Sequence, residues 1–219
     1  MALHTKYRYE VFQNLFFGTL FYFSPTLFEG RAPDGCYNTD SMPLAFITGI
    51  STAGKSTVAK ELSKLGYEAY DTEHDGMSAY FNIATGERAA GFNEAPERTE
   101  AWLDQHEWLI DENKVASLQE KAEAESKTIF LCGGSENESE VHAMCKWVIW
   151  LKTDEETIRR RVNNPRDHDY GTRPHELARA ITSNKEKETG YRNNGAIIID
   201  ARQPIHKVIE EILSITVET

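Results

Sequence analysis

The chain has 219 residues and a formal net charge of −11, and 40% of its residues are hydrophobic. This length suffices for one domain with a buried core, and the acidic balance argues against a general nucleic-acid binder, although a nucleotide needs only a local basic pocket. The three cysteines, Cys36, Cys132 and Cys145, show no paired spacing. We therefore expect free thiols in a reducing compartment, and with them a cytoplasmic protein.

Residues 1–41 differ in composition from the rest of the chain, because aromatic side chains are concentrated there. Gly18 and Pro25 interrupt the apolar stretch, so it does not predict a membrane span. Two interpretations stay open: a loosely attached or non-native extension, with Met42 as the natural start, or an arm that docks on a partner or a membrane. Residues 42–219 are expected to form one domain.

The first predicted strand, residues 44–47, leads into a glycine-rich run that fits the pattern G-x-x-x-x-G-K-[ST], and then into a helix expected over residues 56–64. The run consists of Gly49, Ile50, Ser51, Thr52, Ala53, Gly54, Lys55, Ser56 and Thr57. Its glycines allow successive N–H groups to turn inward, and the following helix adds the positive end of its dipole. Strand, loop and helix together predict a phosphate-binding loop.

Two side chains of this loop are expected to act on a bound triphosphate. Lys55 can reach the outer phosphates as a mobile point charge. The Ser56 hydroxyl is placed to bind Mg²⁺, which keeps most of its waters and takes few protein ligands. The loop therefore predicts a site for a nucleoside triphosphate with Mg²⁺.

The rest of the chain alternates between short apolar strands and helices. A strand ending at Asp71, a loop or hairpin over residues 80–92 and a helix over residues 102–110 are expected first. Asp111 then caps a helix, and Thr153 begins a capping box for another. The later elements, in chain order, are helix 111–125, strand 128–132, strand 147–151, helix 154–162, helix 174–189, strand 196–199 and helix 204–215.

Continuous apolar strands that alternate with helices indicate a parallel sheet covered on both faces. Ligands of such sheets bind beyond the carboxyl ends of the strands, so residues directly after each strand become site candidates. These candidates are the phosphate loop, Asp71, Glu73, Gly133, Gly134, Thr153 and residues 200–202.

In this order along the chain, the features resemble the shikimate kinase and nucleoside monophosphate kinase group of P-loop small-molecule kinases. The resemblance covers Pro43 to about Ile215. It implies an α/β, three-layer P-loop NTPase fold, with a five-stranded parallel sheet of order 2-3-1-4-5 and helices on both faces. It also implies ATP as the phosphoryl donor and a mobile lid at about residues 163–173. The chain departs from the family in a longer, aromatic insertion on the acceptor side at about residues 79–110.

The same resemblance implies roles for residues at the strand ends. Asp71 and Glu73 look like the acidic pair of shikimate kinases, in which the first acid supports Mg²⁺ through water and the second touches the substrate hydroxyl. Gly133 and Gly134 resemble the glycine-rich turn beside the acceptor. Arg202 falls where the family holds the adenine.

Residues 159–161, and then Arg166 and Arg173, supply arginines where the family has its lid, and we expect Arg166 and Arg173 to cancel charge on the phosphoryl group in transfer. From the residues alone, they are equally well explained as solvated charges of a plain surface loop. Arg161 is open to pairing with Glu155 or Glu156 on its own helix.

Three other candidate residues also have two possible interpretations. Asp71 either orients or deprotonates an acceptor hydroxyl, or caps the end of its strand. Trp102 and Trp108 either line the acceptor site or belong to the core. The arginines with which the family clamps a carboxylate are not matched: Phe92 is not followed by arginine, and Lys187 precedes Glu188 near Tyr191.

The sequence therefore predicts an ATP- and Mg²⁺-dependent kinase for a small-molecule acceptor of nucleoside, nucleotide or hydroxy-acid type, with no nucleic-acid or membrane partner. The alternative is a nucleotide-binding regulatory NTPase, a switch that acts through a partner. The identity of the acceptor and the oligomeric state stay open.

Overall fold

The structure is a computed structural model, and it describes residues 43–92, 94, 98–164 and 170–217. The expectations for residues 1–41, together with Cys36 and Arg166, lie outside the described residues. In the described part of the chain, no helix combines the length and the apolar character that crossing a membrane requires.

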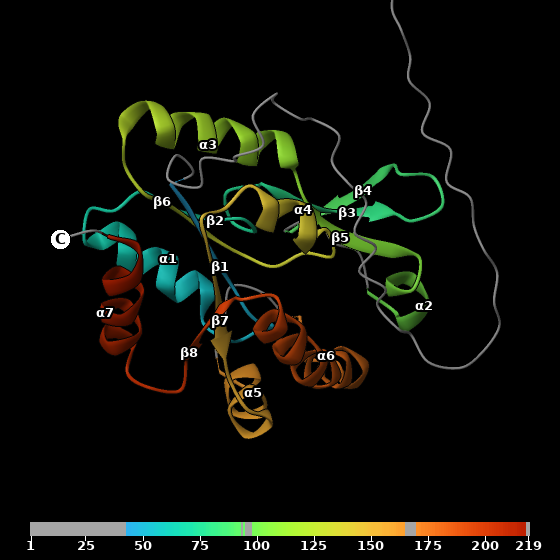
Figure 1. The fold of residues 1–219 in the computed structure, drawn as a ribbon. Helices are drawn as coiled ribbons and strands as arrows, with labels where there is room; N and C mark the ends of the chain where they lie inside the picture. The colour runs from blue at the N-terminus through green and yellow to red at the C-terminus, as the bar shows by residue number, and fades with distance from the viewer. Residues whose placement is uncertain (1–42, 93, 95–97, 165–169, 218–219) are drawn as a thin grey trace, which may run out of the picture. The chain divides into compact units, whose positions relative to one another are not determined.

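Five strands form one parallel sheet, which Figure 1 shows at the centre of the domain. They are β1 (Leu44–Thr48), β2 (Ala69–Asp71), β6 (Ile129–Cys132), β7 (Trp147–Lys152) and β8 (Ile197–Asp200). The order across the sheet is β2-β6-β1-β7-β8, and all neighbours run parallel. When only these five strands are numbered along the chain, the order is 2-3-1-4-5, so the predicted fold is confirmed.

Helices cover both faces of this sheet. The described helices are α1 (Lys55–Lys64), α2 (Glu100–Leu103), α3 (Glu112–Glu125), α4 (Glu138–Ala143), α5 (Glu155–Val162), α6 (Pro174–Asn193) and α7 (Ile205–Thr216), and of these the short α2 packs beside the strand that follows it and not on this sheet. Successive side chains of a strand point to opposite faces. Along β1, Ala45 and Ile47 accordingly pack with α1 and α7, whereas Leu44 and Phe46 pack with α3 and α4 (Figure 1). The three predicted layers are thus present, with a buried core on each side of the strands.

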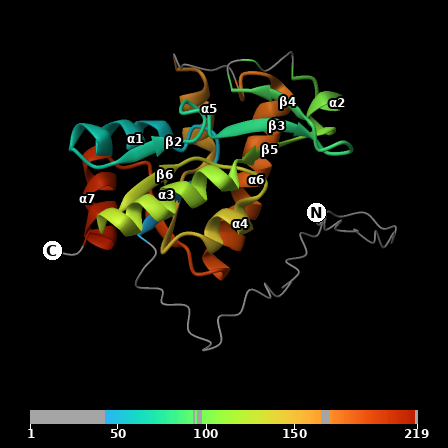
Figure 2. The ribbon, with the colours of Figure 1, turned by 90° about the horizontal axis from the view of Figure 1, so that it is seen from above.

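A second sheet is antiparallel, has the order β4-β3-β5 and lies to one side of the parallel sheet (Figure 2). Its strands are β3 (Ser78–Asn82), β4 (Arg88–Gly91) and β5 (His106–Ile110). β3 and β4 form the hairpin expected over residues 80–92. The helix expected over residues 102–110 is wrong, because only α2 is helical there and β5 follows it. Pairing along the whole length of β3 outweighs the helical spacing of the two tryptophans.

Two helix starts were predicted from capping residues, and one needs correction. The Asp111 carboxylate accepts a hydrogen bond from the backbone N–H of Asn113, which confirms it as the cap of α3. The cap of α5 is Asp154 and not Thr153, since the Asp154 carboxylate accepts from the N–H of Thr157 at 2.8 Å. Aspartate is a better cap than threonine, so the helix begins one residue later than the capping-box pattern indicated.

Candidate active site

The loop between β1 and α1 has the backbone shape of a phosphate cradle. A Cβ atom at Gly49 would lie 2.9 Å from both the Ala53 Cβ and the Leu151 carbonyl oxygen, so a side chain does not fit there. Gly54 has a φ of 110°, which favours glycine, and it directly precedes the first residue of α1. Thr52 adopts a φ of 73°, which is uncommon for a residue with a side chain.

Lys55 lies against this loop. Its Nζ donates hydrogen bonds to the carbonyl oxygens of Gly49 at 3.0 Å and Ile50 at 3.2 Å. The ammonium group is therefore already held at the cradle, where bound phosphate oxygens would replace the carbonyls as its partners.

Arg161, which the resemblance placed in the lid region, contacts the phosphate loop, and the sequence interpretation missed this contact. Its Nη1 donates to the carbonyl oxygens of Thr52 and Ala53, both at 3.0 Å, and its Nη2 donates to Ala201 at 2.6 Å. The predicted pairing with Glu155 is wrong for Arg161 and is made by Arg159. Arg161 instead joins the phosphate loop to the segment after β8.

A signal for Arg161 was present in the helical spacing of α5. Ile158 and Val162 are buried, so the inner face of the helix is the face that passes through them. Arg161 lies three residues after Ile158 and therefore next to that face, whereas Arg159 and Arg160 point away from it.

The predicted acidic pair lies at the end of β2. The Asp71 carboxylate accepts from the backbone N–H groups of Glu73 at 3.0 Å and His74 at 3.2 Å, and its other oxygen is 3.0 Å from the His74 Nδ1. Asp71 thus caps the turn, as its structural reading predicted. Burial raises the pKa of Glu73, while the charge of Lys55 opposes that rise and the charge of Asp71 adds to it. Glu73, Asp71 and Lys55 therefore share one electrostatic environment.

Gly133 and Gly134 follow β6 at the same edge of the sheet. A Cβ at Gly133 would lie 2.0 Å from the Thr72 Oγ1, so only glycine lets β6 pass so close to the chain after β2. A Cβ at Gly134 would lie 4.0 Å from the Cε of Lys55 and 3.7 Å from the Gly49 carbonyl oxygen. The glycine turn is thereby next to the phosphate loop, as the sequence predicted.

Arg173, the second lid candidate, precedes α6 and belongs to a buried ion cluster. Its Nη1 donates to the Glu176 carboxylate at 3.0 Å, and the same oxygen accepts from the Nε of Arg98 at 2.9 Å. The other oxygen of Glu176 accepts from the N–H of Gly171 at 2.8 Å. Glu176 is fully buried, so it fastens the start of α6 to the chain before α2.

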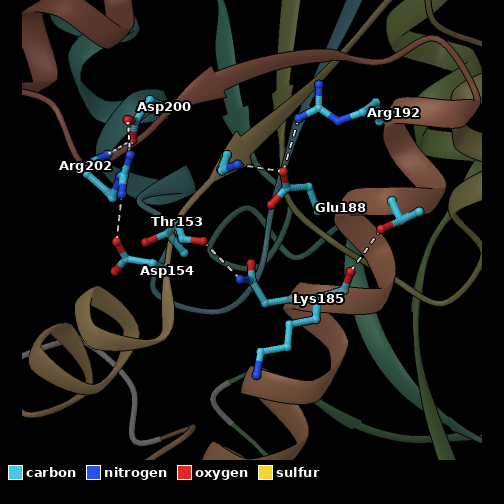
Figure 3. Close-up of polar contacts among 10 residues, drawn as sticks. Thr153, Asp154, Lys185, Glu188, Arg192, Asp200 and Arg202 are labelled. Atoms are coloured by element: carbon cyan, nitrogen blue, oxygen red, sulfur yellow. Dashed lines mark hydrogen bonds and ion pairs between the residues drawn. The ribbon is translucent and has the colours of Figure 1, made fainter.

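Arg202 lies at the ends of β7 and β8, where Figure 3 shows it between two carboxylates. It donates to Asp200 through Nε at 2.8 Å and Nη2 at 2.7 Å, and to Asp154 through Nη1 at 2.9 Å. The hydrogen bond from Arg202 is the main cause that lowers the pKa of Asp200 to about 2. These hydrogen bonds hold the flat guanidinium at the sheet edge. The nearby carbonyl of Thr153 accepts a hydrogen bond from the side-chain amide of Asn184.

The residues at the position of the missing substrate arginine make contacts within the domain. Glu188 forms ion pairs with Lys152 at 2.9 Å and with Arg192 at 3.2 Å, and Figure 3 shows the contact with Arg192. Lys187 donates to Glu138 at 3.0 Å. These two positions of α6 therefore support the contact between that helix and its neighbours.

A family model described as an AAA domain matches residues 46–189, which is more than half of the chain. The chain belongs to this family. The match includes the phosphate loop, the acidic pair and the glycine turn. The sheet order and the phosphate loop are also those implied by the resemblance to P-loop small-molecule kinases. None of the curated proteins matches the chain.

Several solved structures are similar to this AAA-domain chain in fold. A shikimate kinase from Acinetobacter baumannii in complex with shikimate is 17% identical, with a TM-score of 0.49, over 81% of this chain and 97% of that one. A sugar kinase from Janibacter sp. HTCC2649 is 19% identical, with a TM-score of 0.46, over 79% and 93%. A deoxyadenosine kinase from M. mycoides is 15% identical, with a TM-score of 0.43, over 78% and 97%. At such identities and TM-scores, these likenesses say nothing of the substrate.

The residues of the loop suit a triphosphate with Mg²⁺. The cradle that excludes a side chain at Gly49, the start of α1 and the Lys55 ammonium supply donors and positive charge. Within the described ranges, no group of three or more His, Cys, Asp or Glu side chains is arranged to hold a metal ion. Mg²⁺ in phosphate loops needs one or two protein oxygens in addition to the phosphates, and Ser56, the residue expected to supply one, follows Lys55 in the first turn of α1.

Proposed function

We propose that this chain is a phosphotransferase that moves the γ-phosphate of ATP to a hydroxyl group of a small metabolite. The observation that carries the proposal is the meeting of three features at one sheet edge. These are the phosphate loop with Lys55, the glycine turn at Gly134 and the acidic pair of Asp71 and Glu73. Phosphoryl transfer depends on positioning and charge cancellation at one place, and these three features supply groups for both.

Each group has a role in positioning or charge cancellation. The amides of the loop and Lys55 hold the outer phosphates, because transfer needs in-line placement more than covalent help. Ser56, and Asp71 through water, would hold Mg²⁺, which supplies positive charge that offsets the charge on the phosphates. Glu73 accepts a hydrogen bond from the acceptor hydroxyl, and its raised pKa increases its affinity for that proton.

The two lid arginines and Arg202 complete the proposal. Following the resemblance, we propose Arg166 and Arg173 as the residues that cancel charge on the transferred phosphoryl group, a role in which a well-placed arginine contributes about 10³–10⁵ in rate. Arg202 offers a fixed guanidinium plane for the adenine, because its donors are already occupied by Asp154 and Asp200.

Two measurements test the proposal. Calorimetry with MgATP should detect binding by the full chain, and a coupled ADP assay with a metabolite panel should detect release of ADP that depends on an acceptor. A nucleotide-binding switch would instead hydrolyse ATP or change conformation with no acceptor present. Absence of binding heat with any purine triphosphate and magnesium would refute both functions.

The variant Lys55→Ala separates catalysis from folding. Its thermal unfolding should stay within a few degrees of the parent protein, while turnover falls by at least about 10²-fold, the loss typical for one preorganised charge at a reacting group. Unchanged turnover in the folded variant would count against the proposed role of the loop.

A further inference from the structure

An aromatic cluster made of Tyr80, Trp102, His106 and Trp108 lies in the region that the sequence assigned to the acceptor. Tyr80 meets both tryptophans edge to face, with ring centroids 4.8 Å from Trp102 and 4.6 Å from Trp108. Trp102 stacks on His106 at 4.1 Å. All four side chains keep part of their surface exposed, so the cluster retains aromatic surface for a ligand.

Polar atoms without a partner accompany the cluster. The Oγ atoms of Ser78 and Ser135 and the Nε1 of Trp108 are buried and have no hydrogen-bond partner among the described residues. Ser78 and Ser135 are only 5% and 4% exposed. Ser78 lies on the same face of β3 as Tyr80, since the two are two residues apart on one strand. Buried hydroxyls are rarely left unpaired, so these groups point to a hydrogen-bonding ligand.

The cluster is joined to the reacting end of the site by Glu136. Its backbone N–H donates to the Trp108 carbonyl at 2.9 Å, and its carboxylate accepts from the Trp108 N–H at 3.0 Å. Ser135, directly before it, follows Gly134, which lies beside Lys55. Along the chain, Ser135 thus lies between Glu136, which contacts Trp108, and Gly134, which lies beside Lys55.

Charges of both signs act on the cluster. Burial raises the pKa of Tyr80, and the charges of Arg98, Glu136 and Glu176 also act on its hydroxyl. Arg98 is bound to the buried Glu176, which fixes its position. An anionic ligand here would meet the carboxylate of Glu136, whose pKa is raised by burial, while the charge of the buried Arg98 is already paired with Glu176. A neutral ligand with hydroxyl groups can instead donate a hydrogen bond to that carboxylate without bringing a second negative charge beside it.

We infer, on the basis of the proposed function, that the acceptor is an uncharged ring compound rich in hydroxyl groups, which lies on the aromatic cluster and hydrogen-bonds to Ser135 and Glu136. Sugars and nucleosides share this chemistry. Carboxylated or phosphorylated acceptors are rejected by the Glu136 carboxylate.

The test uses the full chain and a panel of matched pairs. Neutral hexoses are paired with their uronates, and nucleosides with their monophosphates, so that charge changes while the ring stays the same. At saturating MgATP, neutral members should stimulate ADP release at least tenfold more than their anionic partners. The response of the sugar pairs compared with that of the nucleoside pairs identifies the source of the ring.

Two variants connect the result to the cluster. Trp108→Phe should raise the KM for the acceptor about tenfold and leave the KM for ATP unchanged, as expected for one lost binding contact. Trp150→Phe is the matched control, because Trp150 also has a buried Nε1 without a described partner but lies in the parallel sheet. Glu136→Gln should reduce the preference for neutral members at least fivefold.

The outcomes separate the two claims. Stimulation by the anionic members, or by no member of the panel while MgATP still binds, overturns the acceptor class and leaves nucleotide binding in place. Failure of MgATP to bind overturns the proposed function itself. Equal effects of Trp108→Phe and Trp150→Phe on the acceptor KM would also overturn the assignment to this cluster.

Discussion

Arg161 offers the sharpest test of how the phosphate loop keeps its shape. Arg161→Met retains most of the aliphatic side chain but removes the hydrogen bonds to the carbonyls of Thr52, Ala53 and Ala201. Thr52 is held at a φ of 73°, and a residue with a side chain loses about 1–2 kcal/mol in the left-handed region. Without Arg161, we expect the loop to relax to a negative φ when no nucleotide is bound.

Nucleotide binding must then restore the strained loop, and the strain is subtracted from the binding free energy. A loss of about 1–2 kcal/mol weakens MgATP binding by about 5–30-fold. Calorimetry measures this dissociation constant directly. Arg159→Met is the matched control, since Arg159 makes an exposed pair with Glu155, and such pairs contribute about 0–1 kcal/mol.

A second substitution tests the cause of the effect. Thr52→Gly removes the conformational penalty at this φ, so it should restore much of the affinity in the Arg161→Met background and change little in the parent chain. If Arg161→Met binds MgATP as tightly as the parent protein, or if Thr52→Gly restores nothing, the strain explanation is wrong.

Three further predictions follow from other contacts. Asp71→Asn should lower kcat by a larger factor than it raises the KM for ATP, because Asp71 lies at the acceptor side of the loop. Steady-state kinetics with both substrates measure the two factors, and a larger change in the KM for ATP than in kcat would contradict the prediction. Gly133→Ala should lower the free energy of unfolding by about 1–3 kcal/mol, because the new Cβ would overlap the Thr72 side chain. Gly190→Ala in α6 should raise it by about 0.5–1 kcal/mol, because a Cβ there has no atom within 4 Å. Denaturant unfolding of both variants measures the difference. Glu73 has a raised pKa in the folded state, so above pH 4.5 the native protein binds more protons than the unfolded chain, and the contribution of Glu73 to stability falls as the pH rises through the folded pKa. Glu73→Gln should therefore unfold at a higher temperature than the parent protein at pH 7.5 and lose that advantage near pH 4. A constant difference in unfolding temperature across this range would contradict the prediction.

The features that the sequence predicted correctly are those that depend on neighbouring residues. The phosphate loop lies within nine residues, and each strand of the parallel sheet is a short apolar run next to a site residue. Once the strands are parallel and buried, their carboxyl ends meet at one edge, so Asp71, Gly134 and Lys55 come together. The local pattern and this rule give the edge at which the candidate residues lie, whereas the order of the strands and the roles of these residues came from the family resemblance.

The features that the sequence did not predict depend on partners far away in the chain. β5 was expected to be helical, because the spacing of Trp102 and Trp108 does not indicate that β3 is available as a pairing partner. Arg161 bonds to backbone carbonyls more than 100 positions earlier, and a carbonyl carries no sequence signal. The ion cluster of Arg98, Arg173 and Glu176 likewise joins residues 78 positions apart.

The same distinction explains why the nucleotide half of the site is easier to predict than the acceptor half. Phosphates are held by main-chain N–H groups, so the requirement on the sequence is for glycines at fixed spacing, as at Gly49 and Gly54. An acceptor is recognised by side chains, and in the acceptor site that we propose they come from the antiparallel sheet, the turn after β6 and the chain before α2. No fixed spacing relates these segments, and only the folded chain brings Tyr80, Ser135 and Arg98 to one place. Substitutions that change acceptor choice should therefore be found in these three segments, whereas substitutions that abolish nucleotide binding should be found in the loop and at Arg161.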